Sequence, residues 1–252
     1  MAHSTAKDNT TSFRIEMDTQ EIRSRYEAGN CDFSGMKLLE IELLQLNLNH
    51  ANFSQSDLRQ SRLGRTHFFQ ANFESSDLSE SILWGSDLRE ARMAHARLRE
   101  ADLSGANLSH AQLVKAYLLK AVLCGANLQR ADLSGACLVE ADLRSTDDSN
   151  TNLMQANLQQ VDLSYGRLSG ANLSGAHLAQ AILCRAHLGV DYRLGAWPTD
   201  LSGANLQGAN LSYADLTGAN LEGANLQGAD LTGTSFHQAN LKDARMPRGI
   251  SR

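Results

Sequence analysis

Apolar side chains recur every five residues along most of the chain. The third positions of consecutive pentads run from Phe33 to Leu188, and a second run extends from Leu201 to Met246. Of these 42 positions, 41 hold Leu, Phe or Met, and the exception is Asp148. Ala, Ser or Thr stands two residues before most of them. A period of five fits neither an α-helix nor an uninterrupted β-strand, so the pattern predicts a repeat architecture.

Each pentad combines a short extended segment with a turn. The small residue and the apolar residue lie two positions apart, so both side chains point to the same side of an extended backbone. The last position of the pentad holds 13 of the 19 glycines, which tolerate tight turns. A chain that turns every five residues and keeps Leu inward predicts a coil with flat sides. Stacking such coils would give one continuous core.

This repeat resembles that of the pentapeptide-repeat family, whose consensus is A(D/N)LXX. The stretches ADLSGANLSHAQL and LSGANLQGANLSYADLTGANLEGANLQGADL match it closely, and the resemblance covers residues 31–246. It implies a mainly β fold, a right-handed quadrilateral β-helix with four pentads per coil. At about 4.8 Å per layer the rod would be about 50 Å long. Residues 247–252 remain as a tail.

The segment before the repeat divides into a leader and a cap. Residues 1–16 are rich in Ser and Thr, and we expect a disordered leader. Residues 17–30 predict a helical cap, with Asp18 or Thr19 as its N-cap and Gly29 as its C-terminal stop. A short capping α-helix there would cover the unpaired backbone at the end of the rod.

Two segments interrupt the repeat, at 146–150 and at 189–200. The first, TDDSN, places Asp148 where Leu belongs, and the second, GVDYRLGAWPTD, shifts the register by three residues. With twenty residues per coil, both are expected to bulge from one side of the rod. They are either tolerated surface insertions or, for the second, a contact loop, because function concentrates in loops. The candidate contact residues of that loop are Tyr192, Arg193, Trp197 and Asp200.

A second candidate contact lies among the outward positions, most of which are polar. Apolar residues there gather near one corner of the predicted rod, and exposed apolar patches commonly mark contacts. The alternatives are scattered surface hydrophobes and contact with another copy of the chain. The residues of this predicted protein-binding patch are Ile82, Trp84, Tyr117, Leu119 and Val122.

No catalytic, cofactor or metal site is predicted. Positions twenty apart should be neighbours on adjacent coils, and no two histidines of the repeat have that separation. By the same count Cys124 and Cys184 share a column three coils apart, too far for a disulfide. The chain contains neither GxxxxGK[ST] nor GxSxG. We therefore interpret the protein as non-enzymatic and free of cofactors.

Composition and charge narrow the class of partner. The net charge of −5 and the pI near 5.9 offer no basic patch for direct nucleic-acid binding. No apolar run approaches the roughly 18 residues of a membrane span, and the N-terminus lacks the apolar core of a secretory signal. Four dispersed cysteines fit a reducing cytoplasm. We expect a cytoplasmic protein with a protein partner and no membrane contact, in an oligomeric state that the sequence leaves open.

Sequence segments that depart from the regular repeat indicate a relationship to one group within the family. Several segments resemble cyanobacterial family members that control heterocyst development: RYEAGN in the cap, the unit SILWGSDL, the two interruptions and the closing MPRG. This resemblance implies a protein–protein interaction module that binds a HetR-type transcription regulator and modulates its inhibition by a peptide. Two alternatives stay open: a DNA mimic that binds a type II topoisomerase such as gyrase, and a self-associating structural rod. A duplex mimic about 50 Å long would need on the order of 30 negative charges, and the net charge is only −5.

Overall fold

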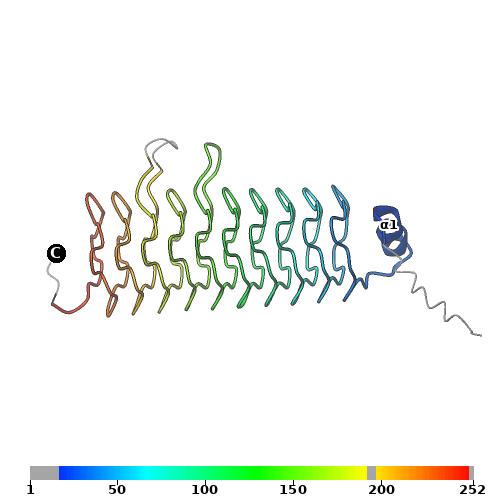
Figure 1. Cartoon of the computed structure of the whole chain (residues 1–252). Coiled ribbons are helices and arrows are strands. Elements are labelled where there is room, and N and C mark those ends of the chain that lie inside the picture. Colours follow the sequence, from blue (N-terminus) through cyan, green and yellow to red (C-terminus); the bar gives the residue numbers. More distant parts are fainter. Residues whose placement is uncertain (1–16, 192–196, 250–252) are drawn as a thin grey trace, which may run out of the picture.

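The structure is a rod of stacked coils that follows a single helix. A computed structural model describes residues 17–191 and 197–249. The helix α1 (Thr19–Glu27) lies at one end of the rod, and the C-terminal coil lies at the other (Figure 1). The expected disordered leader, residues 1–16, falls outside the described residues. Within the described part, no helix has the length and apolar character needed to cross a bilayer.

Parallel β-bridges join the coils in four ladders. The residue before each inward Leu bridges its counterpart on the next coil, usually twenty residues later. We name the ladders by their ends: A from Asp32 to Arg245, B from Lys37 to Asp230, C from Glu42 to Ser235 and D from Asn47 to Asn240. Each coil therefore contributes one pentad to each ladder, in that order, and the backbone forms a β-helix.

The inside of the rod is an uninterrupted apolar column. The third position of every bridged pentad is buried from Phe33 to Leu226. Near α1 the rings of Phe33, Phe53 and Phe73 stack with centroids 5.1 and 5.3 Å apart. Among the described residues, every buried side-chain nitrogen or oxygen has a hydrogen-bond partner. One pentad cannot bury its Leu alone, so the core exists only in the stack.

The turns rely on glycine less than the sequence suggests. The last residue of a pentad has a positive φ except before the two insertions, at Ser145 and Val190, and in the final pentad, and 25 described residues other than glycine adopt it. Two hydrogen bonds support the turn at Asn52: its side-chain oxygen accepts from the Ser54 N–H at 3.1 Å, and the Ser56 N–H donates to the Phe53 carbonyl at 3.2 Å. Polar, charged and even aromatic residues are therefore tolerated at corners that glycine would turn with less strain.

Helix α1 covers the N-terminal end of the core. Asp18 is its N-cap, and the Asp18 carboxylate accepts the Glu21 N–H at 2.8 Å. Ile22 is completely buried against the first coil, and the Tyr26 hydroxyl donates to the Asn49 carbonyl at 3.1 Å. The helix thus supplies the apolar and polar contacts that the first coil lacks from a preceding one.

Both interruptions are insertions between ladders C and D. The D bridge from Asn127 to Asn152 spans 25 residues, and the one from Asn172 to Asp200 spans 28, instead of 20. Figure 1 shows both excursions, one green and one yellow, on the same edge of the rod. The ladder bypasses residues 146–150, so they are not a defective repeat unit, and Asp148 is exposed.

This bypass corrects the predicted column of cysteines. After the first insertion, a step of twenty residues no longer leads to the same ladder. Cys124 follows Leu123 on ladder C, whereas Cys184 follows Leu183 on ladder B, so the two share no column. Both are free thiols. Burial, followed by the proximity of Asp142, raises the pKa of Cys124 to about 11, which keeps this thiol unreactive at neutral pH.

A buried threonine closes each insertion in the same way. The Thr151 hydroxyl donates to the Arg144 carbonyl and accepts the Gly125 N–H, both at 2.9 Å. The Thr199 hydroxyl donates to the Leu168 carbonyl and accepts the Gly170 N–H, both at 3.1 Å. Each hydroxyl accepts the N–H of the glycine that ends the pentad on the preceding coil; at the first insertion that N–H also keeps its regular partner, the Arg144 carbonyl, at a long 3.4 Å.

Candidate protein-binding surface

The exposed apolar side chains gather on one part of the rod. They lie on ladders B and C, on the corner between these ladders, or in the second insertion. Ladders A and D turn mostly Asn, Gln, Ser and Gly outward, above all in the C-terminal half. Because exposed apolar patches mark contacts, ladders B and C are the candidate binding surface. Among the described residues, the exposed large apolar side chains are Leu39, Ile82, Trp84, Tyr117, Tyr165, Ile182, Trp197 and Tyr213.

A shallow groove of about 700 Å³ follows ladder B over the first five coils. Outward side chains of successive coils line it, because neighbouring coils lie only about 4.8 Å apart. Leu39 is at its N-terminal end and is 48% exposed, and Tyr117 is at its other end and is 41% exposed. An apolar contact point therefore marks each end of the groove.

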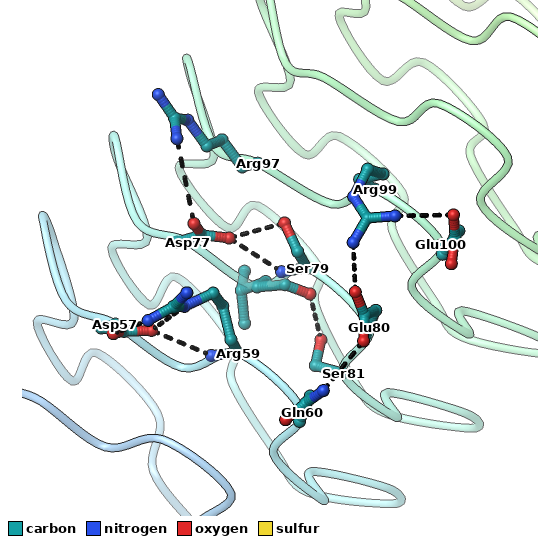
Figure 2. Close-up of polar contacts among 11 residues, drawn as sticks. Asp57, Arg59, Gln60, Asp77, Ser79, Glu80, Ser81, Arg97, Arg99 and Glu100 are labelled. Atoms are coloured by element: carbon teal, nitrogen blue, oxygen red, sulfur yellow. Dashed lines mark hydrogen bonds and ion pairs between the residues drawn. The ribbon is translucent and has the colours of Figure 1, made fainter.

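Charged side chains fill the groove between these ends (Figure 2). Arg59 holds Asp57 through two hydrogen bonds of 2.7 Å. Arg99 lies between two carboxylates: it pairs with Glu80, and its Nη1 donates to Glu100 at 2.6 Å. The groove is thus lined by ion pairs that run from coil to coil, and most of its charge is already neutralised.

These contacts keep the carboxylates ionised. The hydrogen bonds from Arg59 lower the pKa of Asp57. The hydrogen bond from Gln60, together with the charge of Arg99, lowers the pKa of Glu80. Arg97 is less engaged, because its side chain is 72% exposed and its Nη1 lies 4.0 Å from Asp77. The guanidinium nearest to Tyr117 along ladder B is therefore the one most available to a partner.

The residues of the predicted patch lie on two ladders. Tyr117 and Leu119 flank Leu118 on ladder B, and Tyr117 bridges to Arg97 in the groove. Ile82, Trp84 and Val122 lie on ladder C. Leu119 and Val122 are half-buried, whereas Ile82, Trp84 and Tyr117 are exposed.

Trp84 has a contact within the rod that the sequence does not reveal. Its ring lies over Gly64 of the preceding coil, where an added Cβ would be 2.8 Å from Trp84 Nε1. The Arg65 guanidinium stacks 4.4 Å from the ring centroid. Trp84 therefore leans toward α1, and Asp102 separates Ile82 from Val122 along ladder C.

The four residues predicted for the contact loop do not lie together in one described segment. Tyr192 and Arg193 lie outside the described residues. Trp197 is 51% exposed, and an added Cβ on Gly170 would be 3.2 Å from Trp197 Cβ. Asp200 is part of ladder D, where its carboxylate accepts the Ser202 N–H at 2.9 Å and Asn220 Nδ2 at 3.0 Å. The structure thus places Asp200 in the repeat and Trp197 at the foot of the insertion.

Three exposed residues on the corner between ladders B and C escaped the sequence reasoning. Tyr165, Arg185 and Tyr213 occupy the same turn position on successive coils. Their spacing is 20 and then 28 residues, because the second insertion intervenes. In the sequence, each of the three is only a bulky residue at a turn position. The order of the coils in the structure shows that they are neighbours.

The surface offers binding groups and no evident metal centre. In the part of the chain that the structure describes, no three His, Cys, Asp or Glu side chains are arranged to hold a metal ion. Arginine forks, carboxylates and tyrosine rings are the side chains that recognise another protein. The arrangement is suited to docking.

Comparisons with known proteins agree with this architecture. The family model for pentapeptide repeats matches eight copies, over residues 29–65, 66–105, 106–144, 149–189, 199–238 and 209–246. Among solved structures, HetL, a pentapeptide repeat protein involved in heterocyst differentiation regulation in the cyanobacterium Nostoc sp. strain PCC 7120, is 49% identical. That match covers 94% of this chain and 100% of HetL, with a TM-score of 0.92.

Two further solved structures are more distant. Rfr23, from the cyanobacterium Cyanothece 51142, is 30% identical over 52% of this chain and 88% of its own, with a TM-score of 0.36. QnrB1, a plasmid-mediated fluoroquinolone resistance protein, is 15% identical over 83% of this chain and 92% of its own, with a TM-score of 0.40. No curated protein matched the chain.

Proposed function

Because the chain belongs to the pentapeptide-repeat family, we propose that it is a non-enzymatic protein-binding module that acts in the cytoplasm as a regulator of heterocyst differentiation. The observation that carries the binding role is the concentration of exposed apolar and arginine side chains on ladders B and C. The 49% identity to HetL over 94% of the chain supports the regulatory context.

Membership of the family gives the β-helix its hand. The rod is a right-handed β-helix, as in the relatives that share its repeat. We take the four ladders to be the four sides of a quadrilateral section. In this geometry ladders B and C are adjacent sides, so one partner can reach both of them round their common corner.

The proposed partner is a HetR-type transcription regulator. The rod would dock on the regulator and modulate its inhibition by a peptide, through surface contact alone. The proposed anchors are the groove residue Tyr117 with Leu119 behind it, and the exposed Trp197 of the second insertion. On ladder C the contact would continue over Ile82, Trp84 and Val122.

Direct binding tests this function. Biolayer interferometry would measure the affinity of a HetR-type regulator for the wild-type chain, with HetL as the reference. We expect Tyr117→Glu to weaken binding about tenfold or more, because it replaces the aromatic ring that the partner would cover with a charged side chain. Gln112→Glu is the matched control, since Gln112 is exposed at the same register position of the same coil on ladder A.

The outcomes separate the alternatives. A regulator that binds HetL and not this chain would refute the proposed partner. Equal affinity of wild type and Tyr117→Glu would refute the surface. Inhibition of DNA supercoiling by gyrase in the presence of the chain would favour the DNA mimic, and a dimer in light scattering without any partner would favour the structural rod.

A further inference from the structure

In the C-terminal half of the rod, the corner between ladders B and C carries large aromatic and basic side chains. There the turn residues of three successive coils are Tyr165, Arg185 and Tyr213, with φ of 58°, 56° and 58°. We name these three residues the Tyr–Arg corner. On ladder D the same three coils turn through Gly175, Gly203 and Gly223. The fold therefore does not need a large side chain at this turn.

The two tyrosines adopt the positive φ that most other turn residues of the rod share. Glycine would adopt it with less strain, and the core does not require a tyrosine there. Both rings are on the surface, with Tyr165 52% and Tyr213 57% exposed. Exposed tyrosines that are held in place are favoured anchors in protein interfaces.

Arg185 is fixed and backed by an aromatic ring. Its guanidinium carbon lies 5.2 Å from the Tyr213 ring centroid. The Tyr213 ring in turn lies over Gly233, where an added Cβ would be 2.7 Å from Tyr213 Cδ1. Among the described residues, no carboxylate forms an ion pair with Arg185. A preorganised guanidinium of this kind presents a free fork for a carboxylate.

The neighbouring charges favour an anionic group. Arg167, which pairs with Asp142 at 3.6 Å, and His187 follow the corner on ladder C. Asp191, the carboxylate nearest in sequence, acts on Arg144, and Asp215 accepts the Thr217 N–H at 3.0 Å and lies against Gly189. Among the described residues, neither carboxylate forms an ion pair with Arg185.

We propose that the Tyr–Arg corner binds an acidic segment of the protein partner, with a carboxylate on Arg185 and apolar side chains on the rings of Tyr165 and Tyr213. This inference rests on the proposed function and adds the chemistry of the contact. A protein is favoured over a nucleic acid, because the exposed rings of Tyr165 and Tyr213 suit apolar side chains and the net charge of −5 disfavours a phosphate backbone.

The test uses variants of the corner and matched controls elsewhere on the rod. Arg185→Gln, Arg185→Glu and Tyr213→Gly change the corner. Arg130→Glu changes an arginine at the same turn position on ladder D, with φ of 57°, and Gln180→Gly changes the same turn position on ladder A. Binding of the HetR-type regulator is measured at low and high salt.

We expect Arg185→Glu to weaken binding about tenfold or more, Arg185→Gln to weaken it less, and high salt to weaken the wild type. Both controls should stay within about twofold of wild type. Tyr213→Gly should weaken binding without lowering the melting temperature, because glycine relieves the strain at positive φ. If Tyr213 only stabilised the fold, Tyr213→Gly would instead lower the melting temperature.

A second probe separates failure of the inference from failure of the proposed function. It is a short fluorescein-labelled peptide of alternating Glu and Phe, compared with its Gln analogue by fluorescence polarisation. If the regulator binds wild type and all corner variants equally, the inference is overturned and the function stands. If the regulator does not bind wild type, the peptide decides: binding that requires both Glu and Arg185 supports the corner, and any other result, including preference for duplex DNA, overturns it.

Discussion

At the scale of the residue, an Asp or Asn that precedes an inward Leu links the turn to the ladder. Asp200 illustrates both roles: its carboxylate accepts the Ser202 N–H within its own turn and Asn220 Nδ2 from the next coil. Asn220 repeats the pattern with Glu222 and Asn240. Acidic residues at this position are therefore parts of the repeat, and their charge says little about a partner.

Where an arginine follows such an aspartate, stability should depend on pH. Arg89 donates to both Asp87 oxygens at 2.8 and 2.7 Å, and these hydrogen bonds lower the pKa of Asp87. A lowered folded-state pKa stabilises the protein above the unfolded value of about 3.9. That contribution is lost as the pH falls through the folded-state pKa.

We expect Arg89→Gln to raise the pKa of Asp87 in a carboxyl NMR titration. The accompanying loss of unfolding free energy above pH 4 should be below about 1 kcal/mol, because the arginine is half exposed. Arg130→Gln, which removes an arginine hydrogen-bonded to Gln155, should leave the titration of Asp87 unchanged. An unchanged pKa in Arg89→Gln would contradict the assignment.

At the scale of the element, each coil depends on the next one for its backbone partners. An insertion displaces or lengthens one of those contacts, and a buried hydroxyl accepts the N–H involved. Thr199 is completely buried and hydrogen-bonds to Leu168 and Gly170 of the preceding coil. The insertion is therefore tolerated because its closing residue restores the polar contacts of the ladder.

Thr199→Val should cost about 1–3 kcal/mol of unfolding free energy in urea, because it removes the hydroxyl that accepts the buried Gly170 N–H, whereas the Leu168 carbonyl keeps the Ala171 N–H. Thr199→Ser keeps the hydroxyl and should cost less. If serine proves as destabilising as valine, methyl packing and not the hydroxyl closes the insertion.

At the scale of the whole molecule, function depends on which ladder carries which side chain. Contacts join only neighbouring coils, so the stack tolerates additions of one pentad. Such an addition still rotates every later residue onto the next ladder. The groove of the first five coils and the Tyr–Arg corner would then face different directions.

Duplicating residues 131–135 between the two surfaces makes this testable. We expect the duplication to fold with a melting temperature close to wild type and to bind the regulator about tenfold or more weakly, if one partner contacts both surfaces. Deleting residues 146–150, which the ladder bypasses, is the control, since it leaves the later ladders in place. Wild-type affinity in the duplication would mean that one of the two surfaces is not used.

Local chemistry made several features predictable. The N-cap at Asp18 follows from side-chain hydrogen bonding within one turn, and the inward Leu positions follow from the period of five. Trp84 and Asp148 could not be placed in this way. The first leans on Gly64 of another coil, and the second lies in an insertion that is as long as one repeat unit.

The turn after every fifth residue, the one buried apolar side chain per turn and the need for a cap can all be read from the chain, because these properties are local and periodic. Which outward residues become neighbours is set by the stacking of the coils. That depends on how many residues each coil takes, and the coils of 25 and 28 residues break the regular count of 20. Tyr165, Arg185 and Tyr213 form one surface for this reason, and Cys124 and Cys184 do not.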